Sequence, residues 1–369
     1  MNGWRKAKWG DIAVLEYGKA LRDYREGRGV TQVFGTNGPI GYATSVPHSL
    51  GPGVIVGRKG AYRGIHFTKS PFAVIDTAFW LKSTEPFDLR WAYYELLTHD
   101  INSMDSGSAI PSTSKEAFYA MPVLIPPLET QKVIAATLGA LDDKIESNRR
   151  TIKLIDEVVR ARFDRDFDVE QVGDGIAIAE LVGINPRRKL ARGEQATYLG
   201  MSSLPEFSPV VLEWEERAFG SGQKFINGDV LMARITPCLE NGKTAIVDML
   251  GEGEVGWGST EYVVLSPRGE FSTPWLYALT RHEVVREWAI RRMTGSSGRR
   301  RFQASGFGEY CIRKPDPAGL AAFNAFAVPM FRKVTQARDE MKSLMRLRDA
   351  LLPELLSGRT SVPVGDVLL

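Results

Sequence analysis

The chain has 369 residues, of which 43% are hydrophobic and 25% are charged, and its formal net charge is +3. A chain of this length exceeds what one hydrophobic core usually fills, so we expect two domains with connecting elements. The balance of charges excludes a strongly acidic protein, but it is too small to indicate a nucleic-acid partner by itself.

The sequence does not indicate a metal site, a disulfide framework or a membrane-spanning segment. The two cysteines, Cys238 and Cys311, and the four histidines do not follow the spacing of a zinc site or of a disulfide framework. The N-terminus is polar, and no run of about 18 apolar residues follows anywhere in the chain. We therefore expect a soluble, reduced protein of the cytoplasm that binds no metal and contacts no membrane.

Residues 1–127 are expected to form a first domain of Gly/Pro turns, short strands and one short helix near Trp91. Three basic residues follow a β-branched run in a glycine-rich turn, where the chain can approach a phosphate closely, and they are Arg58, Lys59 and Arg63. Thr36 and Asn37 lie in another turn. Asparagine can pair with adenine, although turn chemistry alone also explains an Asn-Gly dipeptide.

Residues 128–166 are expected to form one long helix. A seam of residues recurs at alternating steps of four and three, and it consists of Ile134, Leu138, Leu141, Ile145, Asn148, Ile152 and Ile155. So narrow a seam is typical of a coiled coil, in which the one polar residue, Asn148, fixes the register at a small cost in stability. At about 1.5 Å per residue the helix reaches on the order of 50 Å, and a helix of that length needs a partner helix.

Residues 167–314 are expected to form a second domain with two basic features. Arg234 follows a β-branched run as Arg58 does, and Lys243 comes soon after it. Three adjacent cations lie in a Gly/Ser loop, and they are Arg299, Arg300 and Arg301. Arginine can pair with phosphates or bidentately with guanine, which favours a DNA contact over the alternative of a solubilising loop.

Residues 315–369 are expected to hold a second long helix and a tail. Its seam keeps the same rhythm and includes Val334, Met341, Leu344 and Leu351. Asp316-Pro317 predicts the start of this helix, and Pro329 predicts a kink or a delayed start of its regular part. The alternative is that each long helix packs only on its own domain.

The two domain-and-helix stretches resemble each other in the same order. Five pairs of segments match: Val33–Gly38 with Tyr198–Ser203, Gly53–Gly60 with Gly228–Ile235, Ile75–Leu81 with Gly258–Val264, Trp91–Leu97 with Trp275–Arg281, and Ser106–Ser108 with Thr294–Ser296. The third match pairs Thr77 with Thr260. The sequence therefore predicts a duplicated α+β domain, each copy followed by a long helix. If the helices form an antiparallel coiled coil, the domains lie at opposite ends and obey a pseudo-two-fold axis, which suits two half-sites of DNA.

No catalytic motif is present in the sequence. The segment that ends in Gly242-Lys243-Thr244 has Pro237 where a phosphate-binding loop needs its first glycine. Pro126-Pro127 is not part of the Asp-Pro-Pro-aromatic motif of amino-methyltransferases, because the neighbouring residues differ. We therefore expect no enzymatic activity in the isolated chain.

Several segments resemble the DNA-specificity subunits of type I restriction-modification systems. PVLIPPLETQKVIAATLGALDDKIESNRRTI (Pro122–Ile152) is similar to the central conserved region of that family, and SGSAIPS (Ser106–Ser112) precedes it as in the family. GVIVGRKGAYRG and DTAFWL resemble its first target-recognition domain, and LLPELLSG (Leu351–Gly358) resembles its C-terminal end. The second half departs from the family pattern, since KPDPAGLAAFNAF (Lys314–Phe326) lacks the expected Pro-Leu-Glu and Gln.

The resemblance implies a non-catalytic subunit that binds double-stranded DNA at a bipartite target, one half-site per recognition domain. It also implies partners, namely two adenine-N6 methyltransferase subunits and restriction subunits that translocate and cleave DNA in defence against foreign DNA. S-adenosylmethionine, ATP and Mg²⁺ would be used by those partners, with no cofactor bound by this chain. The alternatives are a specificity subunit of a type IIB or solitary methylation system, or a two-headed scaffold without a DNA role.

Overall fold

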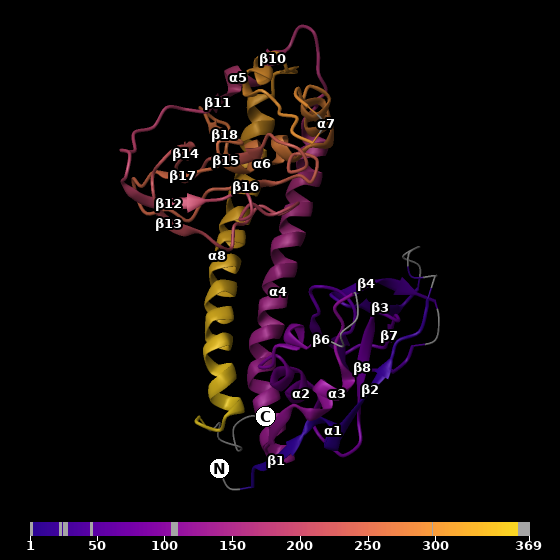
Figure 1. The fold of residues 1–369 in the computed structure, drawn as a ribbon. Coiled ribbons are helices and arrows are strands. Elements are labelled where there is room, and N and C mark those ends of the chain that lie inside the picture. Colours follow the sequence, from indigo (N-terminus) through magenta and orange to yellow (C-terminus); the bar gives the residue numbers. More distant parts are fainter. Residues whose placement is uncertain are drawn as a thin grey trace. The chain divides into compact units, whose positions relative to one another are not determined.

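The computed structural model describes residues 3–21, 24, 29–44, 47–104, 110–296 and 298–360. The serine segment Ser106–Ser108, which the sequence matched to Thr294–Ser296, lies outside the described residues. The chain divides into two compact units, Met1–Asp143 with Leu344–Leu369 and Lys144–Ser343. Each unit combines one α/β domain with a part of both long helices (Figure 1), so the division cuts across the helices.

The first unit contains two small sheets. A four-stranded antiparallel sheet has the order β2 (Ala13–Tyr17), β8 (Ala78–Ser83), β5 (Gly53–Gly57), β6 (Ile65–Thr68), and a three-stranded sheet has the order β4 (Gly38–Ala43), β3 (Thr31–Gly35), β7 (Phe72–Val74). This unit also contains the strand pair β1 (Arg5–Lys8) and β9 (Pro122–Ile125), the helices α1 (Trp9–Ile12), α2 (Leu89–Leu96) and α3 (Lys115–Ala120), and the 3-10 helix η2 (Ile101–Ser103).

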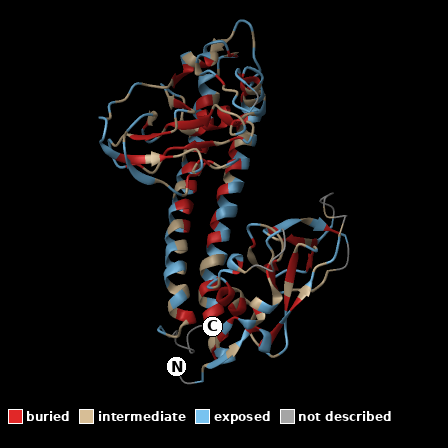
Figure 2. Ribbon diagram, in the orientation of Figure 1, coloured by how far each residue is buried: buried red, intermediate tan, exposed pale blue. Residues whose placement is uncertain are grey.

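Burial explains why these segments of the first unit adopt their structure. Strand β5 is a Gly-Val-Ile-Val-Gly run that is buried along its whole length between β8 and β6 (Figure 2). Helix α2 begins after Asp88, whose carboxylate accepts the backbone N–H groups of Arg90 and Trp91 at 2.9 and 2.8 Å. The Trp91 ring is fully buried and stacks on Trp9, with ring centroids 6.4 Å apart. A helix cap and an aromatic anchor thus hold α2 against the sheet.

The second unit repeats this topology. Its four-stranded sheets have the orders β11 (Val182–Ile184), β18 (Tyr262–Pro267), β15 (Val230–Ala233), β16 (Thr244–Ile246) and β13 (Glu215–Ala218), β12 (Gln195–Leu199), β17 (Gly256–Gly258), β14 (Gln223–Phe225). The remaining elements are the strand pair β10 (Ile176–Ala177) and β19 (Cys311–Ile312) and the helices α5 (Ile178–Leu181), α6 (Thr273–Arg281) and α7 (Glu283–Arg291). The parallel pair β3–β7 recurs as β12–β17. The duplication predicted from the sequence is therefore present in the strand order.

The strand registers correct one pairing inferred from the sequence. The strand pair β5–β8 corresponds to the strand pair β15–β18. The two pairs have the same register when Arg58 is aligned with Arg234. The backbone N–H of Arg58 donates to the Thr77 carbonyl at 2.9 Å, and that of Arg234 donates to the Glu261 carbonyl at 3.0 Å. Thr77 thus corresponds to Glu261, and the predicted match with Thr260 was wrong by one residue. Sheet register is set by the hydrogen-bond ladder, and a shared residue type is weaker evidence of equivalence.

The two long helices are continuous. Helix α4 (Leu128–Asp166) has 39 residues and α8 (Pro317–Leu356) has 40. Helix α8 begins at the predicted place, and the Asp316 carboxylate accepts the Gly319 N–H at 2.9 Å. It runs through the exposed Pro329, so the predicted delay of its regular part does not occur. Proline removes one backbone hydrogen bond, and burial of seam residues such as Val334 offsets that loss.

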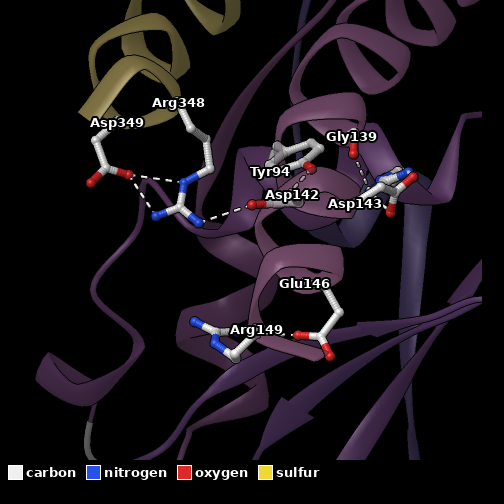
Figure 3. A network of polar contacts seen from close by, with 9 residues as sticks. Tyr94, Gly139, Asp142, Asp143, Glu146, Arg149, Arg348 and Asp349 are labelled. Atoms are coloured by element: carbon white, nitrogen blue, oxygen red, sulfur yellow. Dashed lines mark hydrogen bonds and ion pairs between the residues drawn. The ribbon is translucent and has the colours of Figure 1, made fainter. Parts of the chain in front are cut away.

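Every predicted seam residue is buried or half-buried, and within each unit the helices pair antiparallel. In the first unit Arg348 of α8 donates to Asp142 of α4 at 2.9 Å, and Tyr94 of α2 donates to the same carboxylate at 2.6 Å (Figure 3). In the second unit the Asn148 amide donates to Glu340 at 2.9 Å. Early residues of one helix therefore face late residues of the other. The predicted α+β fold, with two domains joined by long helices, is confirmed.

Candidate nucleic-acid interface

In the first domain, the turn after β5 is held between two other segments. The Thr36 hydroxyl donates to the Lys59 carbonyl at 2.7 Å, from the β3–β4 turn. On its other side the turn pairs with residues 111–113, because Gly60 N–H donates to the Pro111 carbonyl and Thr113 N–H to the Arg58 carbonyl, both at 2.9 Å. Gly60 has a φ of +120°, which side chains rarely allow, so glycine is required at this bend. The fold thus brings Thr36, Arg58 and Lys59 together.

The side chains at this turn gather cations around one aromatic ring. The Arg58 guanidinium lies 4.9 Å from the Tyr17 ring centroid, and the Lys115 ammonium lies 4.1 Å from it. Arg58 Nη1 also donates to the Asp76 carbonyl oxygen at 3.0 Å, and Lys59 Nζ lies 3.6 Å from the Asp76 carboxylate. Tyr17 is half exposed, so the cluster combines positive charge with an aromatic side chain that solvent reaches. The sequence reasoning did not identify Tyr17 or Lys115 as site residues.

Arg63 has a different role from the one predicted. Its side chain is buried, and its guanidinium donates to carbonyl oxygens of four residues, Gly60, Ile101, Asn102 and Met104. These bonds fix the loop after β5 to the segment after α2. The prediction that Arg63 faces DNA is therefore corrected, because a guanidinium enclosed by backbone carbonyls is a structural brace.

The β3–β4 turn presents Asn37 to solvent, while Thr36 is half-buried. Beneath the turn, His66 lies close to Gly38, so a Cβ added to this glycine would stand 3.3 Å from the imidazole. Burial lowers the pKa of His66, so the ring is neutral near pH 7 and adds no charge to the turn. Asn37 is therefore an exposed amide beside the basic turn.

The second domain joins equivalent segments in the same way. In each domain we call the contact between the turn after the central strand, β5 or β15, and the second loop a junction. Phe302 N–H donates to the Arg234 carbonyl at 2.8 Å, and Thr236 N–H donates to the Arg300 carbonyl at 3.1 Å. The loop that carries Arg299–Arg301, here named the arginine loop, thus lies beside the turn after β15. In the same way, residues 111–113 lie beside the turn after β5. Arg301 pairs with Ile235 as Ser112 pairs with Lys59, so the arginines occupy the place of residues 110–112 in the first domain.

The cations of the second junction are held by carboxylates. Glu261 accepts hydrogen bonds from Arg234 Nε at 3.2 Å and from Arg301 Nε at 2.8 Å. Arg300 lies 3.5 Å from Glu240, and the Arg299 side chain is exposed. Lys243 is half-buried, and its ammonium donates to the Met201 carbonyl at 3.0 Å, which gives it a bracing role within the domain.

Both junctions carry cations that can bind nucleic acids, and the first also carries an exposed amide, Asn37, and a partly exposed aromatic ring, Tyr17. Ammonium groups and guanidinium forks pair with phosphates, guanidinium forks and amides read base edges, and aromatic rings stack on bases. Within the described ranges, no group of three His, Cys, Asp or Glu side chains is placed to hold a metal ion. The same part of the chain contains no helix whose length and apolarity suit a bilayer span.

The fold and these two junctions define a duplicated, two-domain protein with an equivalent basic surface on each domain. Residues 1–157 match the family model of the type I restriction modification DNA specificity domain. The predicted family resemblance is thereby confirmed.

Two curated relatives are similar to the chain in sequence, and one solved structure is similar in fold. The chain is 27% identical to the type I restriction enzyme EcoEI specificity subunit of Escherichia coli over 198 residues, covering 52% of this chain and 32% of that protein. It is 27% identical to the EcoAI specificity subunit of the same organism over 184 residues, covering 48% and 30%. The chain thus spans about a third of the length of these relatives. The S subunit of a type I restriction-modification system from M. genitalium shares the fold, with a TM-score of 0.64, 16% identity and 96% coverage of both chains.

Proposed function

We propose that this chain is the DNA-specificity subunit of a type I restriction-modification complex and that it has no catalytic activity of its own. The observation that carries the proposal is the junction that recurs in the two duplicated domains. In each domain an arginine after a central strand, Arg58 or Arg234, is hydrogen-bonded through its backbone to a second loop. Two equivalent surfaces on one chain suit a target with two half-sites.

The two junctions keep one backbone arrangement and differ in side chains, which supports two different half-sites. Arg58 lies against Tyr17, whereas Arg234 is paired with Glu261. We assign Lys59 and Arg299 to phosphates, because cations that solvent reaches suit a sequence-independent contact. Asn37 is assigned to a base edge, since its exposed amide can pair with adenine.

The long helices act in this proposal as a spacer between the recognition domains and as part of the docking surface for methyltransferase subunits. Those partners bind S-adenosylmethionine and transfer the methyl group to adenine. Restriction subunits, where present, use ATP and Mg²⁺ to cleave unmodified foreign DNA. The complex works in the cytoplasm, where the host DNA lies.

Genome-wide mapping of N6-methyladenine in the host tests the proposal. With the gene intact we expect one bipartite methylated motif, which disappears when the gene is deleted. An Arg58→Ala strain should alter the first half of the motif and leave the second half intact. A motif that persists in the deletion strain would contradict the proposal.

A second assay tests the absence of catalysis. The purified chain should neither transfer methyl groups from S-adenosylmethionine to DNA nor cut DNA. Methylation by the chain alone, free of partner subunits, would show that it is an enzyme.

A further inference from the structure

Glu261 contacts two candidate DNA-binding arginines at once. Its Oε2 accepts from Arg234 Nε at 3.2 Å and its Oε1 accepts from Arg301 Nε at 2.8 Å. The three side chains are partly exposed, with 20% for Glu261, 24% for Arg234 and 37% for Arg301. One carboxylate therefore ties the end of β15 to the arginine loop at a place that solvent reaches.

Both contacts use the Nε–H of the guanidinium. Arg301 also donates through Nη1 to the Arg299 carbonyl at 3.2 Å. Each terminal amino group has two N–H bonds, so both arginines keep donors at the end of the guanidinium, and this end matches the O6 and N7 acceptors of guanine. The carboxylate also fixes the plane of the guanidinium, so less side-chain freedom is lost when a base is bound. Glu261 is thus placed to orient two forks for end-on reading.

The described part of the first domain has no carboxylate side chain at the equivalent position. Thr77 occupies the position equivalent to Glu261, because its carbonyl accepts the Arg58 N–H as the Glu261 carbonyl accepts that of Arg234. Arg58 instead uses a terminal amino group, Nη1, to donate to the Asp76 carbonyl at 3.0 Å. The orientation of the arginine is therefore set differently in the two domains.

We propose that Glu261 is a positioning residue that determines the specificity of the second domain, by orienting Arg234 and Arg301 as paired readers of guanine. Its negative charge also disfavours a phosphate at this place, so the arginines are directed to base edges. The proposal rests on the DNA-reading function proposed above and deepens it.

Selection from duplexes with a randomised central segment tests the role of Glu261. The full-length chain is purified from its host with the subunits that accompany it, and the bound DNA is sequenced. The matched control is Glu287→Gln, which removes the same charge from an exposed ion pair with Arg291 on helix α7. Wild type and E287Q should select the same bipartite motif. E261Q should lose about tenfold of the guanine preference in one half of the motif and none in the other half.

Arg234→Lys tests whether the guanidinium itself reads the base, because lysine retains the positive charge and lacks the two terminal amino groups of the guanidinium. It should reduce the guanine preference in the same half as E261Q does. An E261Q motif identical to that of the wild type would overturn the role of Glu261 while leaving the proposed function intact. An equal loss of preference in both halves would overturn it too, since a positioning residue acts on one domain. If the wild type selects no motif, the proposed function fails as well.

Discussion

Replacing Arg299 and Arg300 with alanine should make DNA binding less dependent on salt. The Arg299 side chain is exposed, and Arg300 lies 3.5 Å from Glu240 with 43% of its side chain exposed. Such an open ion pair is worth about 0–1 kcal/mol, so Arg300 can exchange it for a phosphate. Backbone hydrogen bonds between Thr294 and Arg301, at 2.8 and 3.0 Å, hold the loop without these side chains. The double variant should therefore lose contacts and keep the loop conformation.

Each phosphate contact contributes about 0.9 to the slope of log K against log salt, so two lost contacts should make the slope shallower by about 1.8. Between about 50 and about 200 mM salt, the variant should lose about tenfold less affinity than the wild type. The assay is a salt titration on one target duplex and one scrambled duplex. Arg313→Ala with Lys314→Ala is the matched control, because both residues are exposed cations of the same unit outside the loop. Equal slopes for wild type and the loop variant would refute the phosphate contacts.

Three further predictions concern stability and spacing. Trp91→Ala should destabilise the protein by about 3–5 kcal/mol in urea unfolding, because the buried ring leaves a cavity beside Trp9, and a loss below about 1 kcal/mol would contradict this. Hydrogen bonds from Arg90 and Lys69 lower the pKa of Asp143 to about 2, so its carboxylate stabilises the fold above about pH 4, and this contribution is lost as the pH falls towards 2. Asp143→Asn should therefore have a lower free energy of unfolding than the wild type at neutral pH. Unfolding measured at several pH values should show this difference in free energy disappear between about pH 4 and pH 2. A difference that does not depend on pH would contradict a stabilising role of the ion pair. Removing one heptad from each long helix should shorten the gap between the methylated half-sites by about three base pairs, because a heptad spans about 10 Å, and an unchanged gap would exclude a spacer role.

The sequence predicted the long helices and the duplication because both leave local signals. A seam at alternating steps of three and four can be found without knowledge of the fold, and so can an ordered set of repeated segments. The partner of Asn148 could not be predicted in this way. Its amide bonds Glu340, 192 residues further along the chain and on the other helix.

The candidate site was predictable where it depends on chain order and unpredictable where it depends on burial. Arg58 and Arg234 follow equivalent strands, so their equivalence could be inferred from the sequence. Arg63 lies in the same basic turn, but only the fold shows its guanidinium enclosed by carbonyls. Tyr17 and Lys115 are 98 positions apart in the chain, and no motif joins them before the sheet brings them together.

The two junctions share their backbone hydrogen bonds and differ in their side chains. Backbone hydrogen bonds from Arg58 to Thr77 and from Arg234 to Glu261 fix the position of each arginine relative to its sheet. These bonds do not depend on the side chain of the accepting residue, so threonine and glutamate are equally compatible with the fold. A substitution at this position therefore leaves the backbone hydrogen bond of the arginine in place. Under the proposed function it changes how the arginine of one domain is oriented, so one half-site can change while the other domain keeps its own reading.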